Sequence, residues 1–133
     1  MRLKFKSTVL ALTVVAVLGL SSCGEDPAAP TISNVEVGEN NSKTAAIGEE
    51  LHMDAEIDAP GKISKIEVEL HPESGSGDDI EAEFTNYSGQ LNADFHEHVE
   101  IPSTAAAGEY HFHLKVTDEE GQTTEVDAEV DIQ

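Results

Sequence analysis

The feature that most constrains the fold of this 133-residue chain is an alternation of apolar and polar side chains with a period of two. In "LHMDAEID", residues 51–58, the apolar positions are Leu51, Met53, Ala55 and Ile57. Successive side chains of a β-strand point to opposite faces, so this segment predicts a strand with one buried face. Such a face must be covered by another layer, and no segment after residue 22 has a convincing helical period. The sequence therefore predicts an all-β sandwich of two sheets.

Turn-forming residues divide the chain into segments that each show this alternation. Pro60-Gly61 and the run "PESGSGDD" are typical of turns and loops, because proline fixes φ and glycine tolerates positive φ. We expect seven strands, at residues 31–37, 50–58, 63–71, 80–87, 95–101, 109–117 and 123–132.

The N-terminus has the features of a bacterial lipoprotein signal peptide. Arg2, Lys4 and Lys6 precede an apolar run, "VLALTVVAVLGL", that is short for a membrane-spanning helix. The following Leu-Ser-Ser-Cys resembles the lipobox, which implies cleavage before Cys23 and acylation of this cysteine, the only one in the chain. The expected organisation is a signal peptide at 1–22, a lipidated cysteine and tether at 23–30, and one domain at 31–133. An ordinary secretory leader is the alternative.

The acidic residues after the cysteine bear on localisation. Gly24-Glu25-Asp26 resembles the export signal of surface-exposed lipoproteins of the Bacteroidota. This resemblance implies an outer-membrane lipoprotein on the cell surface, with a periplasm-facing position as the alternative. The expected partners are the lipid bilayer, through acylated Cys23, and an outer-membrane transport or receptor protein.

The charge of the chain excludes one class of partner. Its formal net charge is −20, and removal of residues 1–22 leaves four basic residues against 27 acidic ones, a net charge of about −23. Such a surface repels nucleic acid and attracts cations, so we expect no nucleic-acid binding.

The C-terminal segment resembles known families. "AAAGEYHFHLKVTDEEGQTTEVDAEVDI" is similar to the last two strands of bacterial immunoglobulin-like and PKD-like domains. This resemblance implies an immunoglobulin-like sandwich in which Tyr110 acts as a tyrosine corner. The blocks "FHEHVEIP" and "YHFHLKVTD" more narrowly resemble the lipoproteins of the domain-of-unknown-function family 4625, from about residue 28 to the end. That resemblance implies no settled activity.

Four of the six histidines form two His-x-His pairs, His96 with His98 and His111 with His113. In a strand, residues i and i+2 point to the same side and lie about 6.6–6.8 Å apart. Both pairs alternate with apolar residues, so we expect them to point outward. Two imidazoles at this spacing can converge on one ion at Zn–N distances of about 2.0–2.1 Å.

Immunoglobulin-like topology gives each pair a neighbour. The sixth predicted strand pairs with the third, which brings His71 toward His111 and His113. The fifth pairs with the second, which brings His52 and Asp54 toward the other pair. The sequence therefore predicts two histidine clusters on opposite sheets, formed by His71, His111 and His113 and by His52, His96 and His98. Either both clusters bind metal, or only one of them does.

The type of ligand indicates the ion. Imidazole suits zinc, copper(II) and nickel, whereas thiolates and thioethers favour copper(I). Because Cys23 is expected to be acylated and Met53 to face the core, we expect zinc or copper(II). The predicted role is metal capture, sensing or storage without catalysis, because a surface site without a cleft does not favour chemistry.

Two other functions fit the same residues. One is a structural or adhesive interaction module in which the histidines are incidental or respond to pH. The other is a hydrolase that uses one histidine cluster with an open coordination position.

Overall fold

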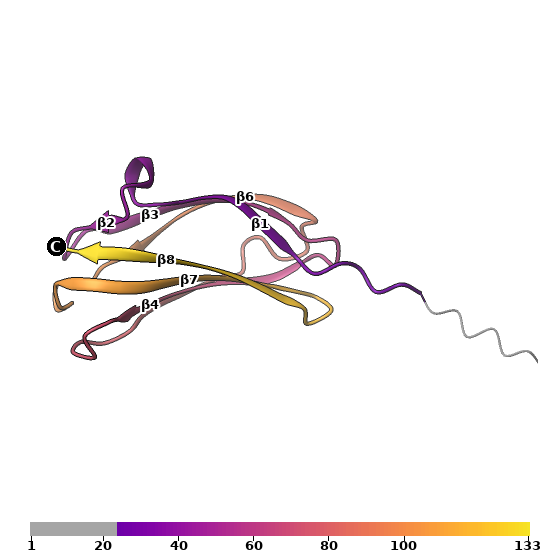
Figure 1. The fold of residues 1–133 in the computed structure, drawn as a ribbon. Helices are drawn as coiled ribbons and strands as arrows, with labels where there is room; N and C mark the ends of the chain where they lie inside the picture. Colours follow the sequence, from indigo (N-terminus) through magenta and orange to yellow (C-terminus); the bar gives the residue numbers. More distant parts are fainter. Residues whose placement is uncertain (1–23) are drawn as a thin grey trace, which may run out of the picture.

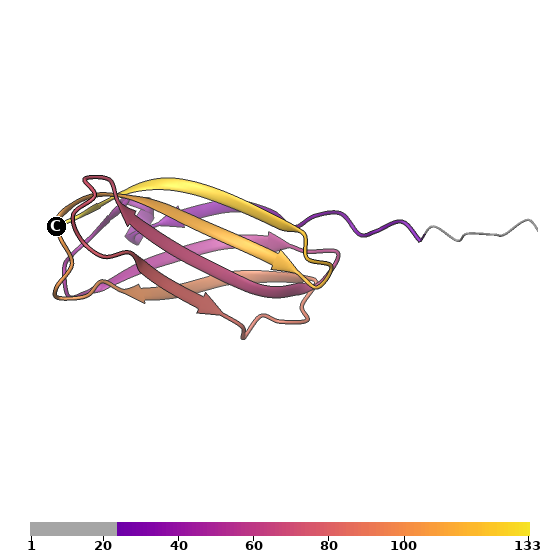
Figure 2. The same cartoon turned by 90° about the horizontal axis from the view of Figure 1, so that it is seen from below.

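The computed structural model of the protein describes residues 24–133, which form two β-sheets packed face to face (Figure 1). One sheet has the strand order β1-β3-β6, with β1 at Thr31–Val37, β3 at Glu50–Asp58 and β6 at Asn92–Glu100. The other has the order β2-β8-β7-β4-β5, seen from its outer face in Figure 2. Its strands are Thr44–Ala45 (β2), Thr123–Ile132 (β8), Gly108–Asp118 (β7), Ile63–Pro72 (β4) and Ile80–Phe84 (β5). A single 3-10 turn, η1 at Glu39–Asn41, lies between β1 and β2.

The all-β, two-sheet prediction is confirmed, and each of the seven predicted strands is present. The structure adds an eighth strand, the two-residue β2, which pairs in parallel with the end of β8. The predicted strand at 80–87 ends earlier, at Phe84, because the chain turns there. The N–H of Ser88 donates to the carbonyl of Thr85, and the N–H of Gln90 donates to that of Tyr87.

The apolar positions of the alternating segments form the core, as predicted. Leu51, Met53, Ala55 and Ile57 of β3 are all buried and face the five-stranded sheet. Tyr110 is buried, and its hydroxyl donates a 2.8 Å hydrogen bond to the carbonyl of Ala106. This bond to a carbonyl four residues upstream is the expected tyrosine corner.

The N-terminal segment is fixed to one end of the sandwich. Gln122 Nε2 donates to the carbonyl of Pro27 at 2.7 Å, and Thr124 Oγ1 donates to that of Pro30 at 2.5 Å. The buried carboxylate of Asp118 accepts hydrogen bonds from the N–H groups of Glu120 and Gln122, which orders the β7–β8 hairpin. Figure 1 shows the N-terminal segment leaving at this hairpin, at the opposite end from the C-terminus.

The expected signal peptide and the expected lipidation of Cys23 lie outside the described residues. Within residues 24–133, no helix has the length and apolar character needed to cross a membrane.

Candidate metal centre

The outer face of the three-stranded sheet gathers three histidines from two strands. Antiparallel pairing of β3 with β6 places His52 opposite His98 and Asp54 opposite His96, as the sequence predicts. The alternation of both strands turns these four side chains away from the core, because their neighbours Leu51, Met53, Phe95 and Val99 are buried. We call His52, His96 and His98 the three-histidine cluster.

The rings of the three-histidine cluster lie in mutual contact. Their centroids are 4.7 Å apart for His52 and His96, 5.0 Å for His52 and His98, and 5.6 Å for His96 and His98. One ring nitrogen of each histidine lies within 4.8 Å of one from each of the others. Three strand positions thus bring three nitrogen donors to one point on the surface.

The shortest distance between two rings joins His52 Nδ1 to His98 Nε2, at 3.1 Å. Two imidazole nitrogens bound to a tetrahedral zinc ion at about 2.0–2.1 Å lie about 3.3–3.4 Å apart. The observed separation is therefore close to the one that a shared ion requires. Without an ion, one of these two nitrogens must carry the proton that joins them.

Asp54 holds two of the three rings. Its Oδ2 lies 2.5 Å from His52 Nε2, and its Oδ1 lies 2.6 Å from His96 Nδ1. Burial alone would raise the pKa of Asp54, but the hydrogen bonds from His96 and His52 outweigh it and hold this pKa below its ordinary value. The carboxylate is thus ionised at neutral pH and orients both rings.

The contacts with Asp54 leave the other ring nitrogen of His52 and of His96 for another ligand. When His52 donates from Nε2 to Asp54, its Nδ1 faces His98 with a lone pair. When His96 donates from Nδ1, its Nε2 remains. A carboxylate that accepts the far N–H of a metal-binding histidine is a common feature of metal sites, since it fixes the tautomer. Here one carboxylate does this for two rings.

The predicted cluster on the five-stranded sheet is arranged differently. Antiparallel pairing of β4 with β7 places His71 opposite His111, as predicted, and the rings of His71 and His113 are 5.4 Å apart. However, the structure does not bring one nitrogen from each of His71, His111 and His113 into a single group. Among the described residues, each of the three belongs to a separate group with two carboxylates.

In each of these three groups, one histidine ring contacts two carboxylates. His71 contacts Glu69 and Asp79, both at 3.0 Å. His111 contacts Glu129 at 2.8 Å and Glu73 at 3.1 Å. His113 contacts Asp127 at 2.7 Å and Glu125 at 3.2 Å. The rings turn toward these acidic neighbours, which draw them away from a common point.

The carboxylates on β8 were not part of the sequence prediction, although the sequence carries a signal for them. Glu125, Asp127 and Glu129 alternate on the outer face of β8, and the antiparallel register places Asp127 opposite His113 and Glu129 opposite His111. Aligning the last two strands by their apolar residues would have found both pairs.

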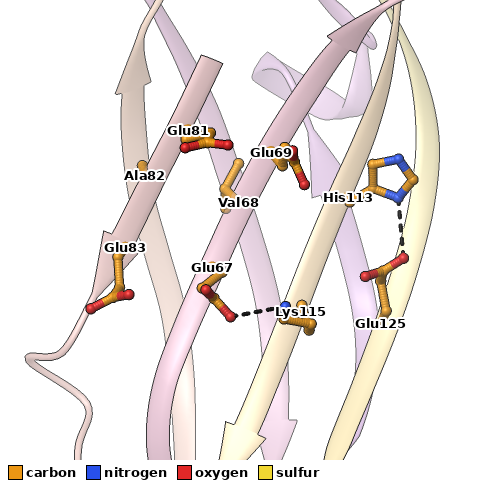
Figure 3. A pocket seen from close by; sticks show the side chains of 9 residues that line it. All are labelled: Glu67, Val68, Glu69, Glu81, Ala82, Glu83, His113, Lys115 and Glu125. Atoms are coloured by element: carbon orange, nitrogen blue, oxygen red, sulfur yellow. Dashed lines mark ion pairs between the residues drawn. The ribbon is translucent and has the colours of Figure 1, made fainter. Parts of the chain in front are cut away.

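A shallow cavity of about 360 Å³ lies on this same outer face (Figure 3). Its centre is a charge network in which Glu67 contacts Lys65 at 2.8 Å and Lys115 at 3.1 Å. The hydrogen bond from Lys65 lowers the pKa of Glu67, against the effect of burial, and Lys115 adds to it. Figure 3 shows His113 turned away from this network toward Glu125. The two basic groups that line this cavity, Lys115 and His113, are thus already paired with Glu67 and Glu125, which disfavours an anionic ligand.

The fold and the three-histidine cluster together describe a small domain of two β-sheets with histidine side chains on its outer faces. The chain belongs to the family described as a domain of unknown function (DUF4625), whose sequence model matches residues 21–133. The resemblance of the two histidine blocks to this family is therefore confirmed. No curated protein matches the sequence significantly.

Solved structures from distant proteins share the fold. OgpA from Akkermansia muciniphila is 12% identical with a TM-score of 0.56, over 79% of this chain and 29% of that one. The Niemann-Pick type C2 protein from the Japanese carpenter ant is 11% identical with a TM-score of 0.52, over 81% and 96% of the two chains. The sporulation control protein Spo0M from Bacillus subtilis is 12% identical with a TM-score of 0.50, over 80% and 50%. This chain spans less than a third of OgpA, and at these identities the likeness concerns the fold alone.

Proposed function

We propose that this protein is a lipid-anchored binding protein for one divalent transition metal ion, held by His52, His96 and His98. The observation that carries the proposal is the contrast between the two sheets. Each histidine of the five-stranded sheet has two carboxylates of its own, whereas the three-histidine cluster shares only Asp54 and places ring nitrogens beside one another.

The donor set supports zinc or copper(II). Three neutral imidazoles suit either ion. The thioether of Met53 is buried in the core, and Cys23, the only cysteine, is expected to be acylated, so neither sulfur ligand favours copper(I) here. The acidic surface raises the local concentration of cations. His96 has 61% of its side chain accessible, so an ion can enter from solvent.

The wider setting of the proposal rests on the sequence. The lipobox-like segment supports acylation of Cys23 and attachment to the outer membrane, and the acidic residues after it support exposure on the cell surface. The strand orders β1-β3-β6 and β2-β8-β7-β4-β5 support an immunoglobulin-like sandwich. The role we propose is metal capture, sensing or storage without catalysis, in contact with an outer-membrane transport or receptor protein.

Titration of metal into the purified protein tests the proposal. We expect one zinc or copper(II) ion per chain by calorimetry, and a loss of at least about 100-fold in affinity for His98→Ala, because two imidazoles replace three. The matched control is His111→Ala, an exposed histidine of the other sheet, which should bind like the wild type. Equal losses in both variants, or no binding in the wild type, would contradict the proposal.

A further inference from the structure

A cleft of about 570 Å³ opens beside the three-histidine cluster, and His52 and His98 form part of its wall. The rest of the wall comes from residues 38–46, from the beginning of β3 and from the C-terminal Gln133. Figure 1 shows η1 rising above the three-stranded sheet at this end of the molecule. The volume lies within the range of about 300–1,000 Å³ that small-molecule sites occupy.

The wall formed by residues 38–46 is built onto β3 at the cluster itself. The N–H of Gly38 donates to the carbonyl of His52 at 2.8 Å, and Asn41 Oδ1 accepts from the N–H of Val37. Gly38 has φ +81° and ψ 161°, a backbone conformation that residues with a Cβ rarely adopt, so glycine is strongly favoured there. The cleft thus has a defined wall that is hydrogen-bonded to the backbone of a proposed metal ligand.

The lining of the cleft selects by charge and hydrogen bonding. Ser42 and Thr44 offer hydroxyls, and Asn40 and Gln133 offer amides. Glu39, Glu49 and Glu50 supply three carboxylates, and no lysine or arginine is among the residues that line the cleft. This environment favours a ligand with hydroxyl, amide or ammonium groups and opposes one with a further negative charge.

We propose that the metal is bound together with a small amine-bearing chelator of the α-amino acid class, whose side chain occupies this cleft. The inference rests on the proposed function. An ion with three imidazole ligands keeps one tetrahedral position, or two when it becomes five-coordinate. The amino nitrogen, after its ammonium loses a proton to the solvent, and one carboxylate oxygen fill two such positions. The side chain then extends along the wall formed by residues 38–46.

The test compares two amino acids that share the metal-binding head and differ in the charge of the tail. Zinc-loaded protein, purified in detergent from cells expressing the full chain, is titrated with L-lysine and with L-glutamate by calorimetry and native mass spectrometry. We expect a 1:1:1 complex of protein, zinc and lysine, with an affinity about tenfold higher than for glutamate, because of the three carboxylates. Ala46→Trp, which fills the cleft, should reduce lysine binding at least about tenfold.

The outcomes separate this inference from the proposed function. If zinc binds but neither amino acid joins it, or both bind equally well, the inference is overturned and the metal site stands. If Ala46→Trp leaves lysine binding intact, the amino acid does not occupy the cleft and the inference also fails. If zinc itself does not bind, the proposed function fails, and with it this extension. Zinc occupancy is read from the same spectra.

Discussion

At the scale of single residues, the neighbours of each histidine distinguish a proposed ligand from an ion-pair partner. His113 and His52 are both partly exposed histidines that alternate with apolar neighbours on a strand. His113 faces two carboxylates, whereas His52 faces one carboxylate and two further imidazoles. Only the second environment offers several neutral nitrogen donors to one ion.

Replacing Asp54 tests how the orientation of the histidine rings affects zinc binding without removing any of the proposed ligands. Asp54→Asn keeps the shape of the side chain but weakens its hydrogen bonds with His52 and His96, so these two rings lose their fixed tautomers. We expect zinc affinity to fall about 10- to 100-fold, the usual effect of losing such a carboxylate, with stoichiometry unchanged. Calorimetric titration measures both quantities. Glu56→Gln, on the same outer face of β3, is the control, and an equal effect there would contradict the role given to Asp54.

The charge state of His71 gives the metal-free protein a dependence on pH. The hydrogen bond that His71 donates to the carboxylate of Asp79 raises the pKa of His71 above 6.5, with Glu69 adding to the effect and burial opposing it. Because the pKa of His71 is higher in the folded state, its protonation stabilises the fold. This contribution is fully present below pH 6.5, the ordinary pKa, and is lost as pH rises through the pKa of the folded state. His71→Gln should therefore lower Tm at about pH 5.5 by about 1–3 °C and leave it unchanged at about pH 8.5. A loss of Tm that is the same at both pH values would contradict this assignment.

At the scale of elements, the β6–β7 connection is held by the tyrosine corner. Tyr110→Phe removes the 2.8 Å hydrogen bond to the Ala106 carbonyl inside the protein. We expect a loss of about 1–3 kcal/mol in the free energy of unfolding, measured by urea denaturation. Tyr87→Phe is the matched control, because the Tyr87 side chain is only partly buried. Water can replace the hydrogen bonds that its hydroxyl makes with Glu97 and with the N–H of His96, so their loss should cost less. The assignment fails if the two variants lose equal stability.

Strands could be predicted from the sequence where apolar and polar residues alternate along the whole segment. Strand β3 buries the four residues that its alternation selects, and the β3–β6 register follows from the topology, so the three-histidine cluster could be placed from the sequence. Strand β2 could not be predicted in this way, because two residues are too few to show an alternation. The second predicted cluster, of His71, His111 and His113, does not form, and the reason is local. The pairing of His71 with His111 was right, but the rings follow carboxylates from the 73–79 loop and from β8.

At the scale of the whole molecule, the N-terminal segment and the three-histidine cluster lie toward opposite ends of the sandwich. The N-terminal segment is hydrogen-bonded to the β7–β8 hairpin through Pro27 and Pro30. His52 and His98 lie toward the other end, since they line one cleft together with the C-terminal Gln133. Residues 24–26 leave at most about 14 Å of chain between Cys23 and Pro27. If Cys23 carries the lipid, the hairpin faces the membrane and the cluster faces away from it.

This geometry predicts an orientation on a bilayer. With Cys23 acylated, a cysteine introduced at Glu120 or at Ser74 is the only thiol and can carry a fluorophore. On phosphatidylcholine vesicles with a headgroup quencher, we expect quenching of the label at position 120 and little at position 74. A variant that combines Gln122→Ala with Thr124→Val, which frees the tether, should reduce the difference. Equal quenching at both positions in the otherwise unchanged protein would contradict a fixed orientation.

The most direct test of the central claim is to identify the ring nitrogens that bind the ion. Long-range ¹H–¹⁵N spectra of the histidine rings report the state of each nitrogen during a zinc titration. We predict that zinc at one equivalent shifts Nδ1 of His52 and Nε2 of His96 and His98, while His52 Nε2 and His96 Nδ1 stay protonated toward Asp54. The rings of His71, His111 and His113 should not respond. Binding by those three instead, or no response from His52, His96 and His98, would contradict the account.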